Sequence, residues 1–179
     1  MKKIITIFMI AAFAANMAGK EAAAGTPDEG RQDKINSDAV AELIRDYNLE
    51  EGFEVVSVGG LGLGLIRMMA KVSADNEEDR AAIEIIDQMK RIIVVDYGEA
   101  EASRKTSFER KITSILDKGE KIMEIKDEDD MVNIYGAGSD DGDSISDLII
   151  YNPGECALIC LFGKISSKKI ADLIVMANE

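Results

Sequence analysis

The chain has 179 residues, 46% of them hydrophobic, and its 21 Lys and Arg against 34 Asp and Glu give a formal net charge of −13. This length and composition are typical of one globular domain with its own core, and the acidic balance argues against nucleic acid or anionic lipid as main partners, because both bind cationic surfaces. The sequence contains no histidine, which excludes histidine-based nucleophilic catalysis, histidine-ligated zinc and a histidine pH switch.

The first residues have the order of a secretory signal peptide. Lys2 and Lys3 form a basic start, residues 4–15 are a short apolar run, and small residues follow up to Gly25. The run is shorter than the ~20 apolar residues that a membrane-spanning helix needs, and no later segment offers a second candidate. We therefore predict removal of residues 1–24 and export to the periplasm or the exterior, rather than a buried N-terminal helix. No cysteine lies in this region, so we expect no lipid anchor.

A short polar leader precedes the domain. Residues 25–34 suit a flexible connection, and a single domain is predicted over residues 35–179. Its first element is an amphipathic helix that begins at Asn36 or Ser37 and is stopped by Gly52. The apolar residues at helical spacing on it are Val40, Leu43, Ile44 and Tyr47.

A glycine-rich segment, GGLGLGLIRMM, follows a predicted strand over residues 53–58. Phosphate-binding loops use such glycines to bring backbone N–H groups to an anion at a helix N-terminus. The spacing does not fit, because Gly62 and Gly64 are followed by Arg67 where the dinucleotide-binding pattern requires Gly or Ala. We therefore expect no cofactor here and predict a closely packed helix. The apolar residues expected to pack are Leu65, Ile66, Met68 and Met69.

The middle of the chain is predicted to be helix, strand, helix. Residues 76–89 have the apolar spacing of a helix, and residues 92–95 form a continuous apolar run typical of a strand buried on both faces. Since helices separate this strand from the previous one, we expect a right-handed crossover between them. Residues 108–116 then predict a further helix that Gly119 ends.

After Gly119 the pattern changes to short strands joined by tight turns. The strand candidates are Lys121–Lys126, Met131–Tyr135, Ile145–Tyr151 and Cys156–Phe162. A last helix, capped by Ser166 or Ser167, carries Ile170, Leu173, Ile174 and Ala177 on one face. The predicted fold class is therefore α+β, with a single mixed sheet, a C-terminal antiparallel meander and helices packed mainly on one face.

The acidic segment SDDGDSISD, residues 139–147, raises the choice between a calcium loop and a hairpin turn. An EF-hand loop needs aspartate at position one and glycine at position six. With Gly142 at position six, position one is Ala137, so the calcium pattern fails. Asp141-Gly142 instead suits a solvated hairpin tip. No metal site is predicted.

A second turn and the only two cysteines follow. Asn152-Pro153-Gly154 predicts a turn in which Pro153 fixes φ and Gly154 supplies a positive φ. Cys156 and Cys160 are placed on one strand, where four residues at ~3.3 Å each separate them by ~13 Å, beyond the ~7 Å that a disulfide allows. We predict two buried free thiols on one side of that strand.

The residues ECALICLFGKISSKKIADL, the hairpin VNIYGAGSDDGDSISDLIIY and the element IIVVDYG together carry a family resemblance. With them and the predicted export signal, the chain resembles the domain-of-unknown-function 4252 family, small exported proteins of Bacteroidetes-type bacteria that are often lipoproteins. The resemblance covers about Phe53 to the last helix, and it implies that Gly163 forms a turn before that helix. It carries over no catalytic residue. The missing cysteine after the signal departs from the lipoproteins of that family.

Two functional classes remain open. The first is a non-enzymatic envelope or secreted module that binds a protein or another surface ligand, favoured by the export signal, the acidic surface and the lack of a catalytic constellation. The second is a hydrolase that uses paired carboxylates without histidine or metal. Acids are too many to nominate a pair, and the run at residues 127–130 is typical of a solvated turn. No catalytic, cofactor-binding or metal-binding residue is therefore predicted.

Overall fold

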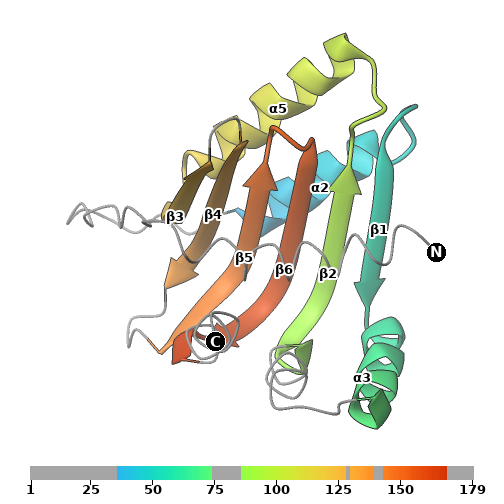
Figure 1. The fold of residues 1–179 in the computed structure, drawn as a ribbon, viewed down its shortest axis with the longest axis vertical. Helices are drawn as coiled ribbons and strands as arrows, with labels where there is room; N and C mark the ends of the chain where they lie inside the picture. The colour runs from blue at the N-terminus through green and yellow to red at the C-terminus, as the bar shows by residue number, and fades with distance from the viewer. Residues whose placement is uncertain (1–35, 74–85, 128–129, 139–142, 169–179) are drawn as a thin grey trace.

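An open antiparallel β-sheet with two helices across one face makes up most of the described chain (Figure 1). The computed structural model describes residues 36–73, 86–127, 130–138 and 143–168. The helices are α2 (Ser37–Tyr47), α3 (Leu61–Ser73) and α5 (Ala102–Leu116). The strands are β1 (Glu54–Gly59), β2 (Met89–Asp96), β3 (Glu120–Asp127), β4 (Asp130–Gly138), β5 (Ser144–Asn152) and β6 (Ala157–Ser166). Within these ranges no helix has the length and apolar character needed to span a membrane.

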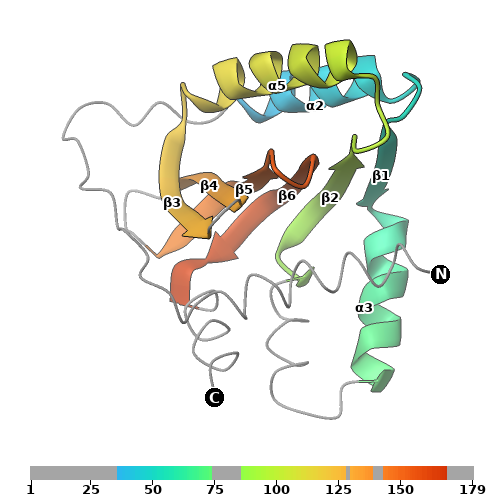
Figure 2. The same cartoon turned by 45° about the horizontal axis from the view of Figure 1, so that its top comes forward.

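The sheet contains six strands in the order β1-β2-β6-β5-β4-β3, and every pairing between neighbours is antiparallel. The predicted α+β class, single sheet and C-terminal meander are confirmed. The predicted right-handed crossover is wrong, because β1 and β2 are antiparallel neighbours. The physical reason is visible in Figure 2, where α3 continues away from the end of β1 instead of crossing a face of the sheet. The strand that follows can therefore return from the same end.

The main core lies between the sheet and helices α2 and α5, which lie side by side over the same face (Figure 2). The Asn36 side chain accepts a hydrogen bond from the Ala39 N–H at 3.0 Å, which confirms the predicted start of α2. Rings of four aromatic residues lie 4.9 to 5.9 Å apart at the centre. These residues are Tyr47, Phe53, Tyr97 and Phe108. The helix-facing side of the domain is therefore well packed.

The predicted helix over residues 76–89 lies mostly outside the described residues. Its last residue, Met89, does not belong to a helix, because it begins β2 and is buried beside Leu63 and Ile165. In the apolar run that follows, Ile93 and Val95 are buried, whereas Ile92 and Val94 are half-buried. The run is thus a strand, as predicted, with better cover on its helix-facing side.

Helix α3 forms where a helix is predicted, but its predicted close packing is wrong. Leu65 and Met68 are 58% and 60% exposed, whereas Leu63 is 1% exposed and packs in a small second core. Gly62 meets the Val58 side chain, where an added Cβ would lie 3.0 Å from a Val58 methyl. Only this side of α3 reaches the sheet, because the helix projects beyond the end of β1 (Figure 1). Its opposite side has nothing to pack against among the described residues.

Of the two predicted turns, the structure describes the one between β5 and β6, which joins the two strands as predicted but with a different conformation. Strands β4 and β5 pair as a hairpin, and the Asp141-Gly142 tip lies outside the described residues. In the β5–β6 turn the positive φ of 53° belongs to Cys156, and Gly154 does not have a positive φ. The Cys156 N–H donates to the Pro153 carbonyl at 3.2 Å, and this turn closes before β6 begins. The chain reverses one residue later than predicted.

Both cysteines are free thiols. Cys156 precedes β6 rather than belonging to it, and Cys160 is fully buried within the strand. Both contact the main core, as predicted for a common side, but the predicted burial is wrong for Cys156, which is half-buried. Burial, with a smaller contribution from the nearby Asp147 carboxylate, raises the pKa of the Cys160 thiol. Cys160 is therefore a core residue and not a nucleophile.

Gly163 lies inside β6 rather than in a turn before the last helix, and residues 169–179 of that predicted helix lie outside the described residues. A Cβ at Gly163 would lie 2.5 Å from the Gln88 carbonyl oxygen, so only glycine lets β6 approach the start of β2 this closely. The Gly163 N–H donates to Asp147 at 3.0 Å. This hydrogen bond joins β6 to β5 at the register shift between Ser146 and Leu148.

Candidate functional site

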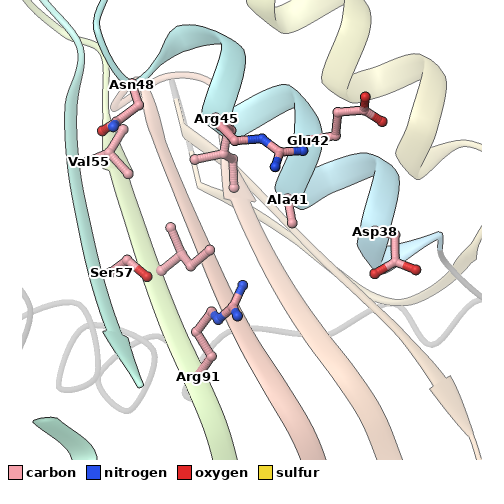
Figure 3. A pocket seen from close by; sticks show the side chains of 10 residues that line it. Asp38, Ala41, Glu42, Arg45, Asn48, Val55, Ser57 and Arg91 are labelled. Carbon is pink, nitrogen blue, oxygen red and sulfur yellow. The ribbon is translucent and has the colours of Figure 1, made fainter. Parts of the chain in front are cut away.

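An open cleft of about 630 Å³ lies between α2 and the β1–β2 end of the sheet (Figure 3). The side chains that line it come from one helix and two strands. They are Asp38, Ala41, Glu42, Ile44, Arg45 and Asn48 of α2 and its C-cap, Val55 and Ser57 of β1, and Arg91 and Ile93 of β2. The cleft reaches the edge of the sheet, because β1 is the outermost strand.

The floor of the cleft is apolar. Ile93 of β2 is buried there, the half-buried Val55 extends the floor towards the edge, and Ile44 of α2 is buried beside it. Strand register explains this placement, since Ser57 pairs with Ile93 and paired residues of neighbouring strands project to the same face. The floor is the part of the helix-facing sheet that α2 does not completely cover.

Two arginines project into the cleft from opposite walls. Arg45 comes from α2 and Arg91 comes from β2; in Figure 3 the Arg45 side chain runs along α2 towards Glu42, and the Arg91 side chain points from the sheet towards the helix. Neither has an ion-pair or hydrogen-bond partner among the described residues. By contrast, Arg104 pairs with Glu50 at 3.4 Å, and Lys121 pairs with Glu124 at 2.7 Å. The cleft therefore offers two guanidinium groups whose donors are free for a ligand.

The remaining polar groups divide the cleft into two ends. Asp38 and Glu42 lie one turn apart on α2, and Asp38 is at the end of that helix far from Arg45 (Figure 3). The Ser57 hydroxyl is on the β1 side. Guanidinium groups recognise carboxylates and phosphates through paired N–H donors. Within the described residues no group of three or more Cys, Asp or Glu is placed to hold a metal ion.

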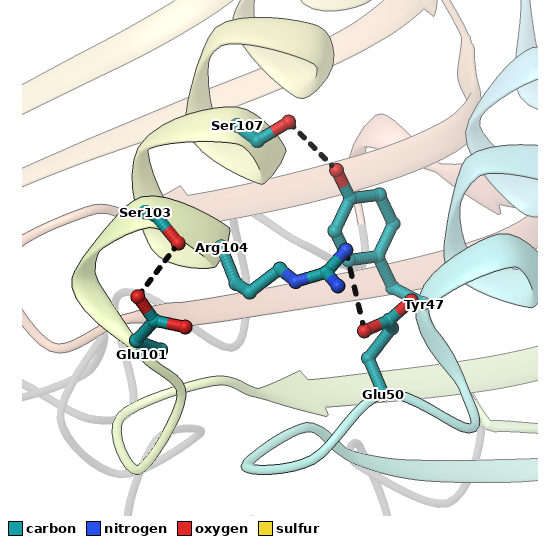
Figure 4. A network of polar contacts seen from close by, with 6 residues as sticks. All are labelled: Tyr47, Glu50, Glu101, Ser103, Arg104 and Ser107. Carbon is teal, nitrogen blue, oxygen red and sulfur yellow. Dashed lines mark hydrogen bonds and ion pairs between the residues drawn. The ribbon is translucent and has the colours of Figure 1, made fainter.

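The helical wall of the cleft is held at its C-terminal end by contacts with α5 (Figure 4). The hydroxyl groups of Tyr47 and Ser107 form a hydrogen bond of 3.1 Å. Arg104 of α5 forms an ion pair with Glu50, which lies just after α2. The Lys111 ammonium lies 5.0 Å from the centre of the Tyr47 ring. These contacts fix the position of α2 near Arg45.

The N-terminal end of the same wall is held by Asp147. The Ser37 hydroxyl donates to Asp147 Oδ2 at 2.6 Å, while the other carboxylate oxygen accepts the N–H of Gly163. Asp147 has a φ of 53° and lies at a register shift of β5, which directs its side chain to both partners. One carboxylate thus ties α2 to two central strands. The wall is anchored at both ends, so the cleft is preformed.

None of the cleft residues is predicted from the sequence as a site residue. One signal was present, because Arg91 alternates with Ile93 and Val95 and so belongs to the buried side of its strand. A charged residue on the buried face of a strand indicates that the helices packed on that face leave this position open to solvent. Arg45 gives no comparable signal, because arginine is ordinary on a helix surface.

Neither a curated protein nor a solved structure matches the chain. A family model, described as Domain of unknown function (DUF4252), matches residues 47–173. This range contains all six strands, α3 and α5, together with Val55, Ser57 and Arg91 of the cleft. The match starts at the last residue of α2, slightly before the start expected at Phe53. Because it covers most of the sequence, the chain belongs to the DUF4252 family.

Proposed function

We propose that this chain is an exported, non-enzymatic binding module of the cell envelope or exterior. Its ligand is a small molecule or chain end that combines a carboxylate with a short apolar part. The observation that carries this proposal is that Arg45 and Arg91 line a preformed cleft with an apolar floor and have no partner among the residues that the structure describes. Export is supported by the signal-peptide pattern of residues 1–24.

The charge of the chain makes this pair notable. Acidic residues outnumber basic ones by 34 to 21, so carboxylate partners are plentiful, and yet neither guanidinium group of the cleft has one within the described part of the chain. A ligand carboxylate between them would receive charge-assisted hydrogen bonds, and its apolar part would contact Ile93 and Val55. Asp38, at the far end, would favour a ligand whose opposite end is neutral or cationic.

The carboxylate-hydrolase alternative gains no support from the described residues. Hydrolase carboxylates face each other across the bond that they cleave. The two acids that line the cleft, Asp38 and Glu42, lie on the same exposed helix surface instead. The cleft geometry therefore favours retention of an anion over cleavage of a bond.

A titration followed by backbone amide NMR tests the binding site, with hexanoate, hexanol and inorganic phosphate as probes. Hexanoate should shift the resonances of Ala41, Ser57 and Arg91, and hexanol should bind more weakly because it lacks the carboxylate. Arg91→Gln should lower hexanoate affinity about tenfold, the effect of losing one hydrogen-bonded charge. Arg110→Gln, on the exposed surface of α5, is the matched control and should leave affinity unchanged.

Equal hexanoate affinity of Arg91→Gln and Arg110→Gln would contradict the proposed site. So would unchanged amide resonances of the cleft residues at ~20 mM hexanoate. Phosphate binding tighter than hexanoate would assign the cleft to a different anion. The proposed export is tested separately by intact-mass measurement of the chain from its native host. A chain that still contains residues 1–24 would contradict it.

A further inference from the structure

We propose that β1 is the pairing edge for a second copy of this chain. The two β1 strands join in antiparallel orientation, which makes one continuous sheet and places the two clefts next to each other. The pairing rests on the strand edge alone. Its consequence for the clefts rests in addition on the proposed function.

The first evidence is the contrast between the two edges of the sheet. On β3 the Lys121, Glu124 and Lys126 side chains form ion pairs at 2.7 Å, and the register shifts between Lys121 and Met123. Charged side chains and irregular register are the means by which edge strands avoid pairing with other chains. On β1 the pairing with β2 has no register shift, and Glu54 is the one ionisable residue of the strand. Among the described residues the β1 edge is therefore regular and carries a single charge.

The second evidence is that β1 fits a copy of itself. A two-fold axis through the centre of the strand sets Val56 opposite Val56 of the second copy and Val55 opposite Ser57. Glu54 then lies opposite Val58, so no two like charges face each other. Val56 is 47% exposed in the single chain, and a valine pair directly opposite across two strands is favourable.

The third evidence is the open side of the cleft. Val55 and Ser57 line it from the outermost strand, so its floor ends at the edge of the sheet. A two-fold axis perpendicular to the sheet keeps the helices of both copies on the same face. The second copy would continue the floor with its own Val55 and Ser57 at the ~4.8 Å spacing of neighbouring strands. A second copy therefore completes the cleft where a single chain leaves it open.

Charge decides how this dimer responds to salt. Removal of residues 1–24, which contain three Lys and one Glu, takes the formal net charge from −13 to −15, so two exported copies repel each other at long range. Salt screens this repulsion, with a Debye length of about 14 Å at 50 mM that falls to roughly 6 Å at 300 mM. An edge-to-edge dimer should therefore tighten as salt rises. A dimer held by ion pairs would weaken instead.

Sedimentation velocity of the exported chain from about 1 to 200 μM, at 50 and 300 mM NaCl, tests the pairing. The expected result is a monomer–dimer equilibrium that is at least threefold tighter at 300 mM. Val56→Lys should abolish the dimer, because it sets two lysines opposite each other. Thr106→Lys, an exposed position on α5 with the same change of charge, should keep it. A monomer under all conditions, or a dimer that survives Val56→Lys, overturns the proposal.

A disulfide measurement keeps the test decisive if Val56→Lys does not fold. Facing residues at the two-fold axis have Cα atoms about 4.5–5.5 Å apart, within the range of a disulfide. Val56→Cys should therefore form a covalent dimer on mild oxidation, and Thr106→Cys should not. Equal cross-linking of both variants overturns the proposed register. Arg91→Gln should retain the dimer while binding hexanoate about tenfold more weakly, which separates failure of the pairing from failure of the binding site.

Discussion

From their composition, helix α3 should be more deeply buried than helix α5, but the structure shows the reverse. The 15 residues of α5 include four basic residues, and yet Phe108, Ile112 and Leu116 are fully buried. The 13 residues of α3 are mostly apolar, and yet Leu61 is 90% exposed. Position relative to the sheet decides this difference, because α5 crosses a face and α3 continues away from a strand end (Figure 2). Apolar composition predicts that a helix forms, but not that it is covered.

The largest expected change in stability comes from a substitution in the buried helix, α5. Phe108→Ala should destabilise the fold by about 3–5 kcal/mol, because it removes a fully buried ring that contacts three other aromatic rings. The matched change on the other helix, Leu65→Ala, should stay within about 0.5 kcal/mol. Urea denaturation at pH 7 measures both. Similar losses for the two variants would show that α3 is covered in solution.

A pair of glycine variants sharpens the same contrast. Gly163→Ala should destabilise the fold by about 1–3 kcal/mol, because the new methyl group would meet the backbone of Gln88 and Met89. Gly64→Ala meets nothing within 4 Å and should stabilise α3 by about 0.5–1 kcal/mol through helix propensity. Thermal unfolding gives both signs directly. A shift of the same sign for both would contradict the assignment of Gly163 to a close strand contact.

A smaller effect is expected at the carboxylate that ties α2 to the sheet. Asp147→Asn should cost about 1 kcal/mol, because it replaces charge-assisted hydrogen bonds from Ser37 and Gly163 by neutral ones. Asn tolerates the positive φ as well as Asp, so backbone strain does not confuse the result. A double-mutant cycle with Ser37→Ala measures the coupling. Additive effects of the two changes would show that the contact does not hold the helix.

The smallest effect is expected on the protected edge strand. Hydrogen bonds from Lys121 and Lys126 lower the pKa of Glu124 from its ordinary 4.5 to about 2. A lowered folded-state pKa stabilises the fold above about pH 4.5, and this contribution is lost as the pH falls towards 2. The Tm difference between the chain and Glu124→Gln should therefore narrow between pH 4.5 and pH 3. It should be small and decrease with salt, since the pair is exposed to solvent. A difference that is constant with pH would contradict the ion pairs.

Much of the fold was predictable because local signals agreed with it. Helix α2 has a capping asparagine and a regular apolar face, and the four C-terminal strands are separated by turn residues. The errors arose where tertiary context decides. Nothing local distinguishes a returning strand from a parallel one across a helix, and nothing in GGLGLGLIRMM shows that the helix projects from the sheet. The positive φ at Cys156 instead of Gly154 is likewise a consequence of how β5 and β6 pair.

The cleft was not predictable for a related reason. Its arginines are 46 positions apart, at 45 and 91, and they meet only because β2 pairs with β1 beneath α2. One alternating pattern, Arg91 with Ile93 and Val95, marked the position of an opening. In a single sequence, Arg91 appears only as an exception to the apolar pattern of its strand. The sequence does not show that Arg45 lies across the cleft from it.

The position of β6 has a consequence for how the protein is made. Among the described strands β6, residues 157–166, is synthesised last and lies between β2 and β5, so the β1–β2 pair has no inner neighbour until β6 has left the ribosome. Pairings between segments far apart in sequence form slowly. The six described strands can therefore form one continuous sheet only after the segment that carries β6 has been synthesised.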